Sequence, residues 1–206
     1  MSFRVEKKIL FQKNNIHEFN NWKKRNDVKE IYETRLISSI YFDNIKNQMM
    51  YDSLEGVVPR YKIRLRQYPN SKNKNIFFEK KISSVEGRYK ISKKINNAEN
   101  FTKLGIQDNR NGKIFPKNTV EYLRSYFLFK NIRFTLDYNI SYNFFERENY
   151  KVVDNLFVLE IKTNNLNYDF EKADFNFLNS VTRFSKYCRS FNFLNYGYQK
   201  AKYETF

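Results

Sequence analysis

The stretch Tyr61-Lys62-Ile63-Arg64-Leu65-Arg66-Gln67-Tyr68 decides how this chain is interpreted. Successive side chains of a β-strand point to opposite faces, so Lys62, Arg64 and Arg66 share one face, opposite two aliphatic side chains. Three cations on one face repel one another unless an anion lies among them. The stretch therefore predicts a strand with one apolar face and one face suited to binding anions.

Arginine or lysine recurs at alternate positions in several other segments. The polar members of these faces are Arg4, Glu6 and Lys8; Glu79 and Lys81; Arg88, Lys90 and Ser92; Tyr122 and Arg124; Arg133, Thr135 and Asp137; and Glu160 and Lys162. Each alone matches an ordinary amphipathic strand with its charges in water. Together they favour one shared basic cavity, because solvated faces usually carry little Arg. Such a cavity needs internal carboxylates, water or a polyanion, since buried unpaired charges are costly.

Eight segments have the alternation and the β-branched or aromatic content of strands. They are Phe3–Phe11, Leu36–Phe42, Arg60–Tyr68, Asn75–Ile82, Arg88–Ile95, Thr119–Phe127, Asn131–Ile140 and Leu156–Thr163. Polar turns at 70–75 and 83–87 indicate antiparallel hairpins. We therefore predict an α+β fold, with a closed eight-stranded antiparallel β-barrel, a basic interior and flanking helices.

Fewer segments are expected to be helical. They are Ile16–Val28, a short turn around Asn44–Tyr51, a segment near Asn100–Leu104 and a C-terminal region Phe170–Tyr187. We expect Asp43 to cap the turn that follows it. With only 5 Gly and 3 Pro and no run typical of a linker, residues 1–206 are expected to form a single domain.

The composition limits the possible partners and chemistry. Lys and Arg number 38 against 22 Asp and Glu, a net charge of +16 that favours polyanionic partners. Most aromatic residues fall on the opposite face from the basic ones, which argues against stacking on single-stranded nucleic acid. Cys188 and His17 are the only residues of their types, so an internal disulfide and Cys or His metal clusters are excluded. We do not expect His17 to be catalytic.

The sequence shows no targeting or membrane segment. The residues from Met1 to Glu6 lack the apolar region of a secretion signal, and no run approaches the roughly 20 apolar residues of a membrane span. A single cysteine fits a reducing compartment. We therefore expect a cytoplasmic location.

The order and spacing of eight short motifs give a more specific indication. They are Arg4-Val5-Glu6-Lys7-Lys8, Ser38-Ser39-Ile40-Tyr41-Phe42-Asp43, Lys62-Ile63-Arg64-Leu65-Arg66, Phe78-Glu79-Lys80-Lys81, Tyr122-Leu123-Arg124, Arg133-Phe134-Thr135-Leu136-Asp137, Leu159-Glu160-Ile161-Lys162 and Phe184-Ser185-Lys186-Tyr187. Across nearly its whole length the chain resembles the catalytic domain of the vacuolar transporter chaperone (VTC) polyphosphate polymerases. These belong to the triphosphate tunnel metalloenzyme (CYTH-like) superfamily. The resemblance implies a tunnel of eight antiparallel strands whose basic residues bind a triphosphate or polyphosphate.

Carried over position by position, the resemblance implies roles for thirteen residues. The catalytic group is Arg64, Arg66, Arg124, Arg133 and Lys186; the substrate-binding group is Lys8, Lys81, Lys90, Tyr122, Lys162, Arg183 and Ser185; and the metal ligand for Mn²⁺ or Mg²⁺ is Glu160. Triphosphatase and adenylate cyclase relatives typically open with Glu-x-Glu-x-Lys, whereas this chain has Arg4-x-Glu6-x-Lys8. This departure favours the polymerase branch and leaves the role of Glu6 open.

Some positions have a second interpretation. Glu160 could instead form a salt bridge to Lys162 or Arg133. Asp137 is expected to hold Arg133 or Arg124 rather than a metal ion. The Ser185-Lys186 pair could lie over the tunnel or simply mark a helix end.

The predicted activity is the metal-dependent transfer of the γ-phosphoryl group of ATP onto a polyphosphate chain, that is, a phosphotransferase. ATP and polyphosphate are the expected partners, with a possible membrane-protein partner and no nucleic acid. A tripolyphosphatase or nucleoside triphosphatase with water as acceptor is an alternative, and so is a polyphosphate-binding module without turnover. No Gly-rich phosphate loop is visible, so we expect the nucleotide base to be held loosely.

Overall fold

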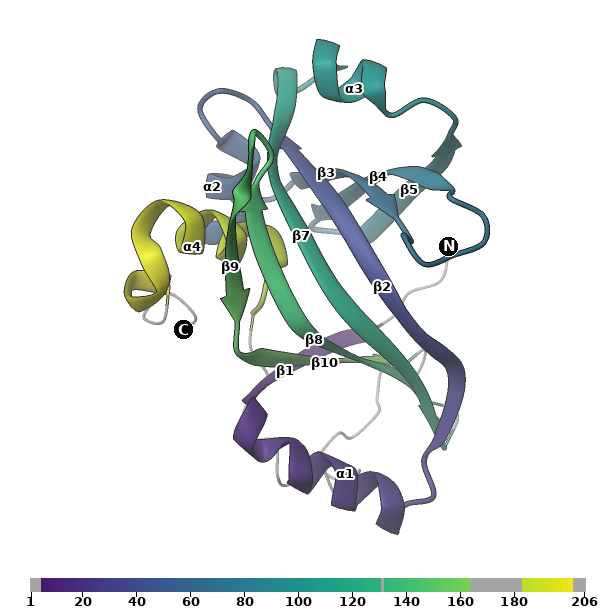
Figure 1. Ribbon diagram of the computed structural model, residues 1–206. Helices are drawn as coiled ribbons and strands as arrows, with labels where there is room; N and C mark the ends of the chain where they lie inside the picture. The colour runs from purple at the N-terminus through teal and green to yellow at the C-terminus, as the bar shows by residue number, and fades with distance from the viewer. Residues whose placement is uncertain (1–4, 131, 164–182, 202–206) are drawn as a thin grey trace.

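A strongly curved antiparallel sheet dominates the computed structural model, which describes residues 5–130, 132–163 and 183–201 (Figure 1). Its strands are β1 (Val5–Gln12), β2 (Lys29–Asp43), β3 (Arg60–Gln67), β4 (Ile76–Ser84), β5 (Gly87–Ile95), β6 (Ile106–Asp108), β7 (Gly112–Phe129), β8 (Ile132–Phe144), β9 (Arg147–Asp154) and β10 (Leu156–Thr163). The helices are η1 (Lys13–Asn15), α1 (Ile16–Arg25), α2 (Gln48–Glu55), α3 (Glu99–Leu104) and α4 (Lys186–Ala201). The predicted α+β class with an antiparallel sheet is confirmed.

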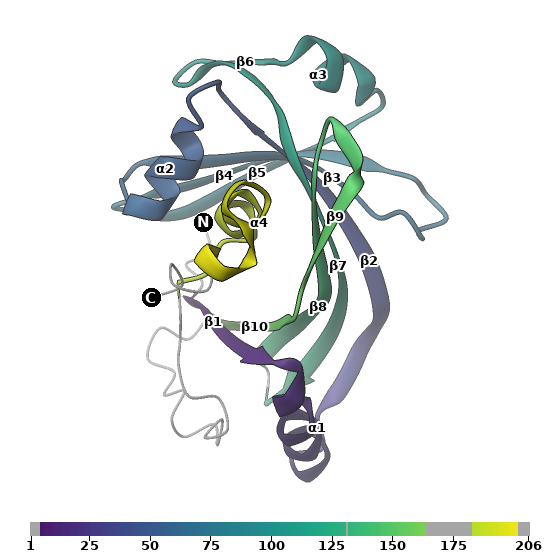
Figure 2. The same ribbon diagram turned by 60° about the vertical axis from the view of Figure 1, so that its left-hand side comes forward.

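The strands follow the order β1-β10-β8-β7-β2-β3-β4-β5, while β6 pairs with β7 and β9 pairs with β8. The predicted closure into a barrel is wrong, because β1 and β5 form the two edges of the sheet and do not pair with each other in the described residues. α4 lies on the concave side between the two ends of the sheet (Figure 2). Just before α4, Phe184 and Ser185 accept side-chain hydrogen bonds from Lys8 and Lys62. At the β5 edge of the sheet, exposed lysines disfavour pairing with another strand.

The register brings the predicted polar faces together on this concave side. Glu160 of β10 lies between Lys8 of β1 and Thr135 of β8. At the other end of the sheet, Arg64 of β3 lies between its partners on β2 and β4. Because each strand alternates with the same period, the charged residues of neighbouring strands form a continuous surface.

Apolar side chains form cores on both sides of the sheet. On the convex side, Phe19 and Trp22 of α1 pack against Phe127 and Phe134 of the strands. On the concave side, the core beneath α4 includes Tyr122, Tyr142, Tyr187 and Phe193. These aromatic cores account for much of the buried surface and hold α4 over the concave face.

Two charged contacts fasten the segments around α4. Arg189 Nε lies 2.5 Å from Asp154 Oδ2, which also accepts a 2.6 Å hydrogen bond from Tyr142 Oη. Asp43 accepts hydrogen bonds from the backbone N–H groups of Met49 and Met50, so its predicted capping role is confirmed. The hydroxyl of Tyr187 donates to the same carboxylate at 2.8 Å, which connects α4 to the start of α2.

Replacing Tyr187 by phenylalanine is expected to lower the free energy of unfolding by about 1–2 kcal/mol, because buried Asp43 loses a hydrogen-bond donor. Urea denaturation followed by circular dichroism measures the change. Tyr150→Phe is the matched control, since that side chain is half exposed, and it should shift the free energy by no more than about 0.5 kcal/mol. Equal effects of the two variants would contradict the proposed contribution of the Asp43 contact.

The structure also differs from the predicted elements. β2 starts at Lys29, before the predicted Leu36, and its first part is mostly exposed and extends by pairing with β7. β6 and β9 were not predicted. The predicted helical region Phe170–Tyr187 lies mainly outside the described residues, and α4 begins only at Lys186. No helix in the described ranges is both long and apolar enough to cross a bilayer.

Candidate functional site

Two arginines of β3 lie on the concave face, where β3 is flanked by β2 and β4. Arg64 Nε donates to Glu79 Oε2 at 2.7 Å, and its Nη1 donates to Tyr41 Oη at 2.9 Å. Arg66 Nη2 donates to Tyr122 Oη at 3.0 Å. Both guanidinium groups are buried, and their partners hold them in fixed orientations. Neither set of contacts uses all five N–H donors of a guanidinium group, so donors remain for a ligand.

Glu79 of β4 is the carboxylate that holds this part of the site. Burial would raise the pKa of Glu79, but the charges of Arg64 and Arg66 and the contact with Lys90 lower it to about 2. Lys90 reaches Glu79 from β5 as an ion pair. Glu79 was not among the predicted site residues, although its alternation with Lys81 placed it on the polar face.

A second cluster joins β7, β8 and α4. Arg124 Nε and Nη2 lie 2.5 and 2.7 Å from the two oxygens of Asp137, and Lys186 Nζ of α4 lies 2.5 Å from the same carboxylate. Burial raises the pKa of Asp137, but Arg124 and Lys186 outweigh it and keep the pKa below its ordinary value. Asp137 therefore holds Arg124, as one of the two predicted alternatives states, and it also holds Lys186.

Two carboxyl groups lie side by side on β1 and β10. Burial, a shared hydrogen bond and repulsion from Glu160 raise the pKa of Glu6. Burial would also raise the pKa of Glu160, but the hydrogen bond from Glu6 and the charges of Arg124 and Lys162 keep it well below its usual range. Lys162 Nζ lies 2.9 Å from Glu160 Oε1, so the predicted alternative of a salt bridge to Lys162 is present.

This carboxyl pair is the part of the site that fits a divalent metal ion. The described residues contain no cluster of three or more His, Cys, Asp or Glu that could hold a metal by themselves. Mg²⁺ is commonly bound by one or two carboxylates together with phosphate oxygens of the substrate. Glu6 and Glu160 supply oxygen ligands of this kind, and their adjacency was not predicted.

Three lysines converge on the space between the two ends of the sheet. Burial is the main cause that lowers the pKa of Lys8, Lys62 and Lys81. Lys81 of β4 is also affected by Glu160 of β10 and by Lys8 of β1, so these distant strands face each other across the concave side. A polyanion placed there would contact cations from both ends of the sheet.

Several buried polar atoms on this face have no hydrogen-bond partner within the described part of the chain. They are Ser39 Oγ, Arg66 Nε and Thr135 Oγ1. Ser39 and Arg66 are paired in register on β2 and β3, and Thr135 is paired with Glu160. A ligand with acceptor oxygens would satisfy the Arg66 donor in particular.

The structure brings most of the predicted site residues onto this face. Those on it are Lys8, Arg64, Arg66, Lys81, Lys90, Tyr122, Arg124, Glu160, Lys162, Ser185 and Lys186. Arg133 is paired in register with Lys162 and lies on the same face, but at an exposed position of β8, with its guanidinium 5.7 Å from the Tyr126 ring centroid. Arg183 is exposed, and its Nη2 donates to the backbone oxygen of Ser53 at 2.7 Å. Arg4 lies outside the described residues.

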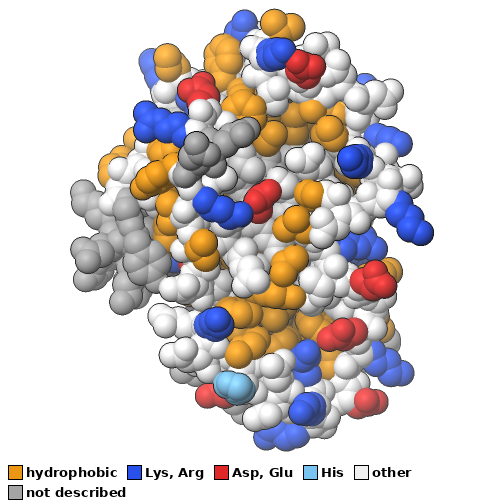
Figure 3. Space-filling view, viewed as in Figure 1, with side chains coloured by type: hydrophobic (Ala, Val, Ile, Leu, Met, Phe, Trp, Pro, Cys, Tyr) orange, Lys and Arg blue, Asp and Glu red, His pale blue; other side chains and the backbone are white. Residues whose placement is uncertain are grey.

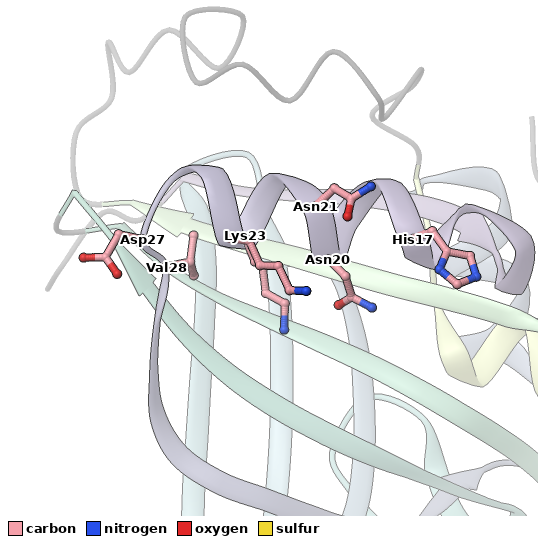
Figure 4. Close-up of a pocket in the computed structure, with 7 residues that line it drawn as sticks. His17, Asn20, Asn21, Lys23, Asp27 and Val28 are labelled. Atoms are coloured by element: carbon pink, nitrogen blue, oxygen red, sulfur yellow. The ribbon is translucent and has the colours of Figure 1, made fainter.

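Two other surfaces of the protein were compared with the concave face for clusters of buried charged groups. On the convex side of the sheet, Lys and Arg are scattered among Asp and Glu, with apolar side chains between them (Figure 3). An open depression of about 440 Å³ lies along α1 and is lined by His17, Asn20, Asn21, Lys23, Lys24, Asp27 and Val28 (Figure 4). It lacks the concentration of buried cations and carboxylates found on the concave face.

The fold and the site together define a class of protein in which a curved antiparallel sheet presents buried cations and a carboxyl pair on its concave side. A family model for the VTC domain matches residues 3–195, so the chain belongs to the VTC domain family. The family resemblance stated from the sequence motifs is thereby confirmed.

Comparison with solved structures finds matches at low sequence identity, of which the first superposes well enough to show a shared fold. A candidate adenylate cyclase from Bacillus halodurans superposes with a TM-score of 0.59 and 13% identity, over 88% of this chain and 94% of that chain. A conserved hypothetical protein from Pyrococcus furiosus gives a TM-score of 0.49 and 13% identity, over 84% and 85% of the two chains. A candidate adenylyl cyclase from Hippeastrum, described as having a dominant triphosphatase activity, gives 0.46 and 11%, over 80% of each chain. No curated protein matches the sequence.

Proposed function

We propose that the protein is a metal-dependent polyphosphate polymerase that transfers the γ-phosphoryl group of ATP onto a polyphosphate chain bound on the concave face. The observation that carries this proposal is the convergence of buried cations from strands at both ends of the sheet and from α4. Arg64 and Arg66 of β3, Arg124 of β7 and Lys186 of α4 all lie on this face. Membership of the VTC domain family supports a condensed phosphate as the ligand.

The chain's own residues would act by positioning and by charge. Phosphoryl transfer gathers negative charge on the equatorial oxygens, and prearranged cations stabilise it without having to reorganise. Arg64 and Arg124 are already held by Glu79 and Asp137, so their remaining N–H donors are prearranged. An oxygen of the terminal phosphate of the acceptor chain forms the new bond to the γ-phosphorus while the bond from that phosphorus to the bridging oxygen breaks and ADP leaves. The acceptor is therefore itself the nucleophile, and no protein nucleophile is required.

Glu160, with Glu6 beside it, would hold the divalent ion, Mn²⁺ or Mg²⁺. When bound, such an ion neutralises phosphate charge and fixes the orientation of phosphate oxygens. Lys8 and Lys162 lie next to the carboxyl pair and would bind phosphate oxygens on either side of it. The concentration of cations selects for the triphosphate group rather than for the base of the nucleotide.

Incubating the purified protein with ATP and Mn²⁺ is expected to produce long phosphate chains, which gel electrophoresis resolves. Removing the metal with EDTA should abolish chain formation, because phosphate charge is then no longer neutralised by the ion. Release of inorganic phosphate without chains would instead indicate a triphosphatase with water as acceptor. Thermal stabilisation by polyphosphate without either product would indicate a binding module.

A further inference from the structure

Lys62 lies on the concave face but was not among the predicted site residues. It precedes Arg64 and Arg66 on the same face of β3, and its Nζ donates to Ser185 Oγ at 2.8 Å. The side chain is partly buried, so its ammonium group lies within the site and remains open to a ligand. Its hydrogen-bond partner is a neutral hydroxyl, and within the described residues no carboxylate forms an ion pair with it.

The other lysines of this face have carboxylates nearby. Lys90 pairs with Glu79, Lys162 with Glu160 and Lys186 with Asp137. Lys8 and Lys81 are both influenced by Glu6 and Glu160, which favour their charged forms. An anionic ligand must compete with these carboxylates for the lysines that they contact. No carboxylate in the described part of the chain forms an ion pair with Lys62, so a ligand has no such competitor there.

Asp43, at the end of neighbouring β2, has its carboxylate bonded to Met49, Met50 and Tyr187. The groups with the largest electrostatic influence on Lys62, and its register partner on β4, come from other elements. They are Lys8 of β1, Lys81 of β4, Arg60 of β3, Arg183 just before α4 and the Cys188 thiol of α4. Of these, four are cations and one is a thiol. Burial and the neighbouring cations lower the pKa of Lys62 to about 8. A bound anion would oppose both effects and favour the charged form.

We propose that Lys62 is a further substrate-binding residue, whose ammonium group binds a phosphate group of the condensed-phosphate substrate directly, beside Ser185. This inference rests on the proposed function and adds a specific phosphate position to it. Binding at this position takes up a proton when the solution pH is near or above the pKa of the free lysine. Affinity therefore falls as the pH rises through about 8, because a growing share of the free protein carries a neutral Lys62.

Calorimetric titration of tripolyphosphate in EDTA tests this inference without metal. Lys62→Met is expected to weaken binding roughly ten-fold at pH 7, because one charge-assisted contact is lost. At pH 8, titrations in two buffers of different ionisation enthalpy count the protons taken up. Wild type should take up about half a proton more than Lys62→Met, since a group with a pKa of about 8 is half protonated there.

The Lys62→Arg variant keeps the positive charge at this position but does not titrate near pH 8. Arginine stays protonated, so this variant should bind within about three-fold of wild type and lose the additional proton uptake. Lys93→Met is the matched control, because Lys93 is exposed on β5 and pairs with the apolar face at Phe78; it should match wild type in both measurements. Thermal unfolding should show Lys62→Met to be at least as stable as wild type, since it removes a partly buried ammonium group that lies among other cations.

Three outcomes would overturn the role of Lys62. Wild-type affinity and proton uptake in Lys62→Met would exclude the contact while leaving the proposed function intact. An equal loss of affinity in Lys62→Met and Lys62→Arg, with proton uptake unchanged, would show that the side chain acts only through the structure around Ser185. Failure of wild type to bind tripolyphosphate at all would overturn the proposed function as well.

Discussion

Replacing Arg64 and Arg66 together by alanine is expected to weaken tripolyphosphate binding roughly a thousand-fold. Both guanidinium groups lie buried on one strand face, and each keeps N–H donors that its protein partners do not use. Two adjacent arginines can therefore bind neighbouring phosphate groups, and the loss of two charge-assisted contacts accounts for the size of the effect. Metal-free calorimetry measures it directly.

The double variant also removes the main partners of buried Glu79, so folding must be checked by circular dichroism. The single variant Arg66→Met leaves the contact between Arg64 and Glu79 in place and should still lose at least ten-fold in affinity. Arg25→Ala with Arg147→Ala is the matched control, because both arginines are exposed. A folded double variant that bound tripolyphosphate as wild type does would exclude the concave face as the binding site.

Replacing Glu160 by glutamine is expected to lower Mn²⁺-dependent turnover of ATP roughly 100- to 1,000-fold. The substitution keeps the shape of the side chain but removes the charge that Arg124, Lys162 and Glu6 maintain in its ionised form. Metal-free binding of tripolyphosphate should be as tight as in wild type or tighter, because the face becomes more positive. Reduced turnover with retained metal-free binding is expected if Glu160 is a metal ligand, whereas a general structural role would reduce both.

Direct binding of Mn²⁺ in the presence of tripolyphosphate, followed by electron paramagnetic resonance, gives a readout independent of activity. We expect Glu160→Gln to weaken it, and Glu121→Gln to leave it unchanged, because Glu121 lies away from the carboxyl pair and contacts exposed Lys151. If Glu160→Gln lost metal-free binding and Mn²⁺ binding to the same extent, the assignment of Glu160 as a metal ligand would fail. Glu160 would then serve only to hold Arg124 and Lys162.

Much of the site could be anticipated because alternation along a strand is a local property of the sequence. The parity of Arg64 and Arg66, and of Glu160 and Lys162, placed each pair on one face, and the register brings these faces together. Alternation along a strand does not determine the register between neighbouring strands, that is, which residues lie opposite each other. The contact of Arg64 with Glu79 depends on that register, and so does the adjacency of Glu6 and Glu160.

The sequence-based predictions that differ from the structure do so for related reasons. Closure of the sheet depends on whether its two edge strands meet. Here Lys8 of β1 and Lys62 of β3 instead donate hydrogen bonds to Phe184 and Ser185, the residues that lead into α4, and α4 lies on the concave side (Figure 2). The first part of β2 has no apolar alternation of its own and becomes a strand by pairing with β7. Lys62 follows the same alternation as its two arginine neighbours, and only the structure shows that, among the described residues, no carboxylate forms an ion pair with it.

The antiparallel sheet, its apolar and basic faces and the family of the chain could all be inferred from the amino-acid sequence. These features depend on residue type and period along each strand, which neighbouring residues set locally. The open edges of the sheet, the position of α4 on its concave side and the pairing of cations with internal carboxylates became visible only in the three-dimensional structure. Those properties depend on distances between residues far apart in the chain, such as Lys62 and Ser185.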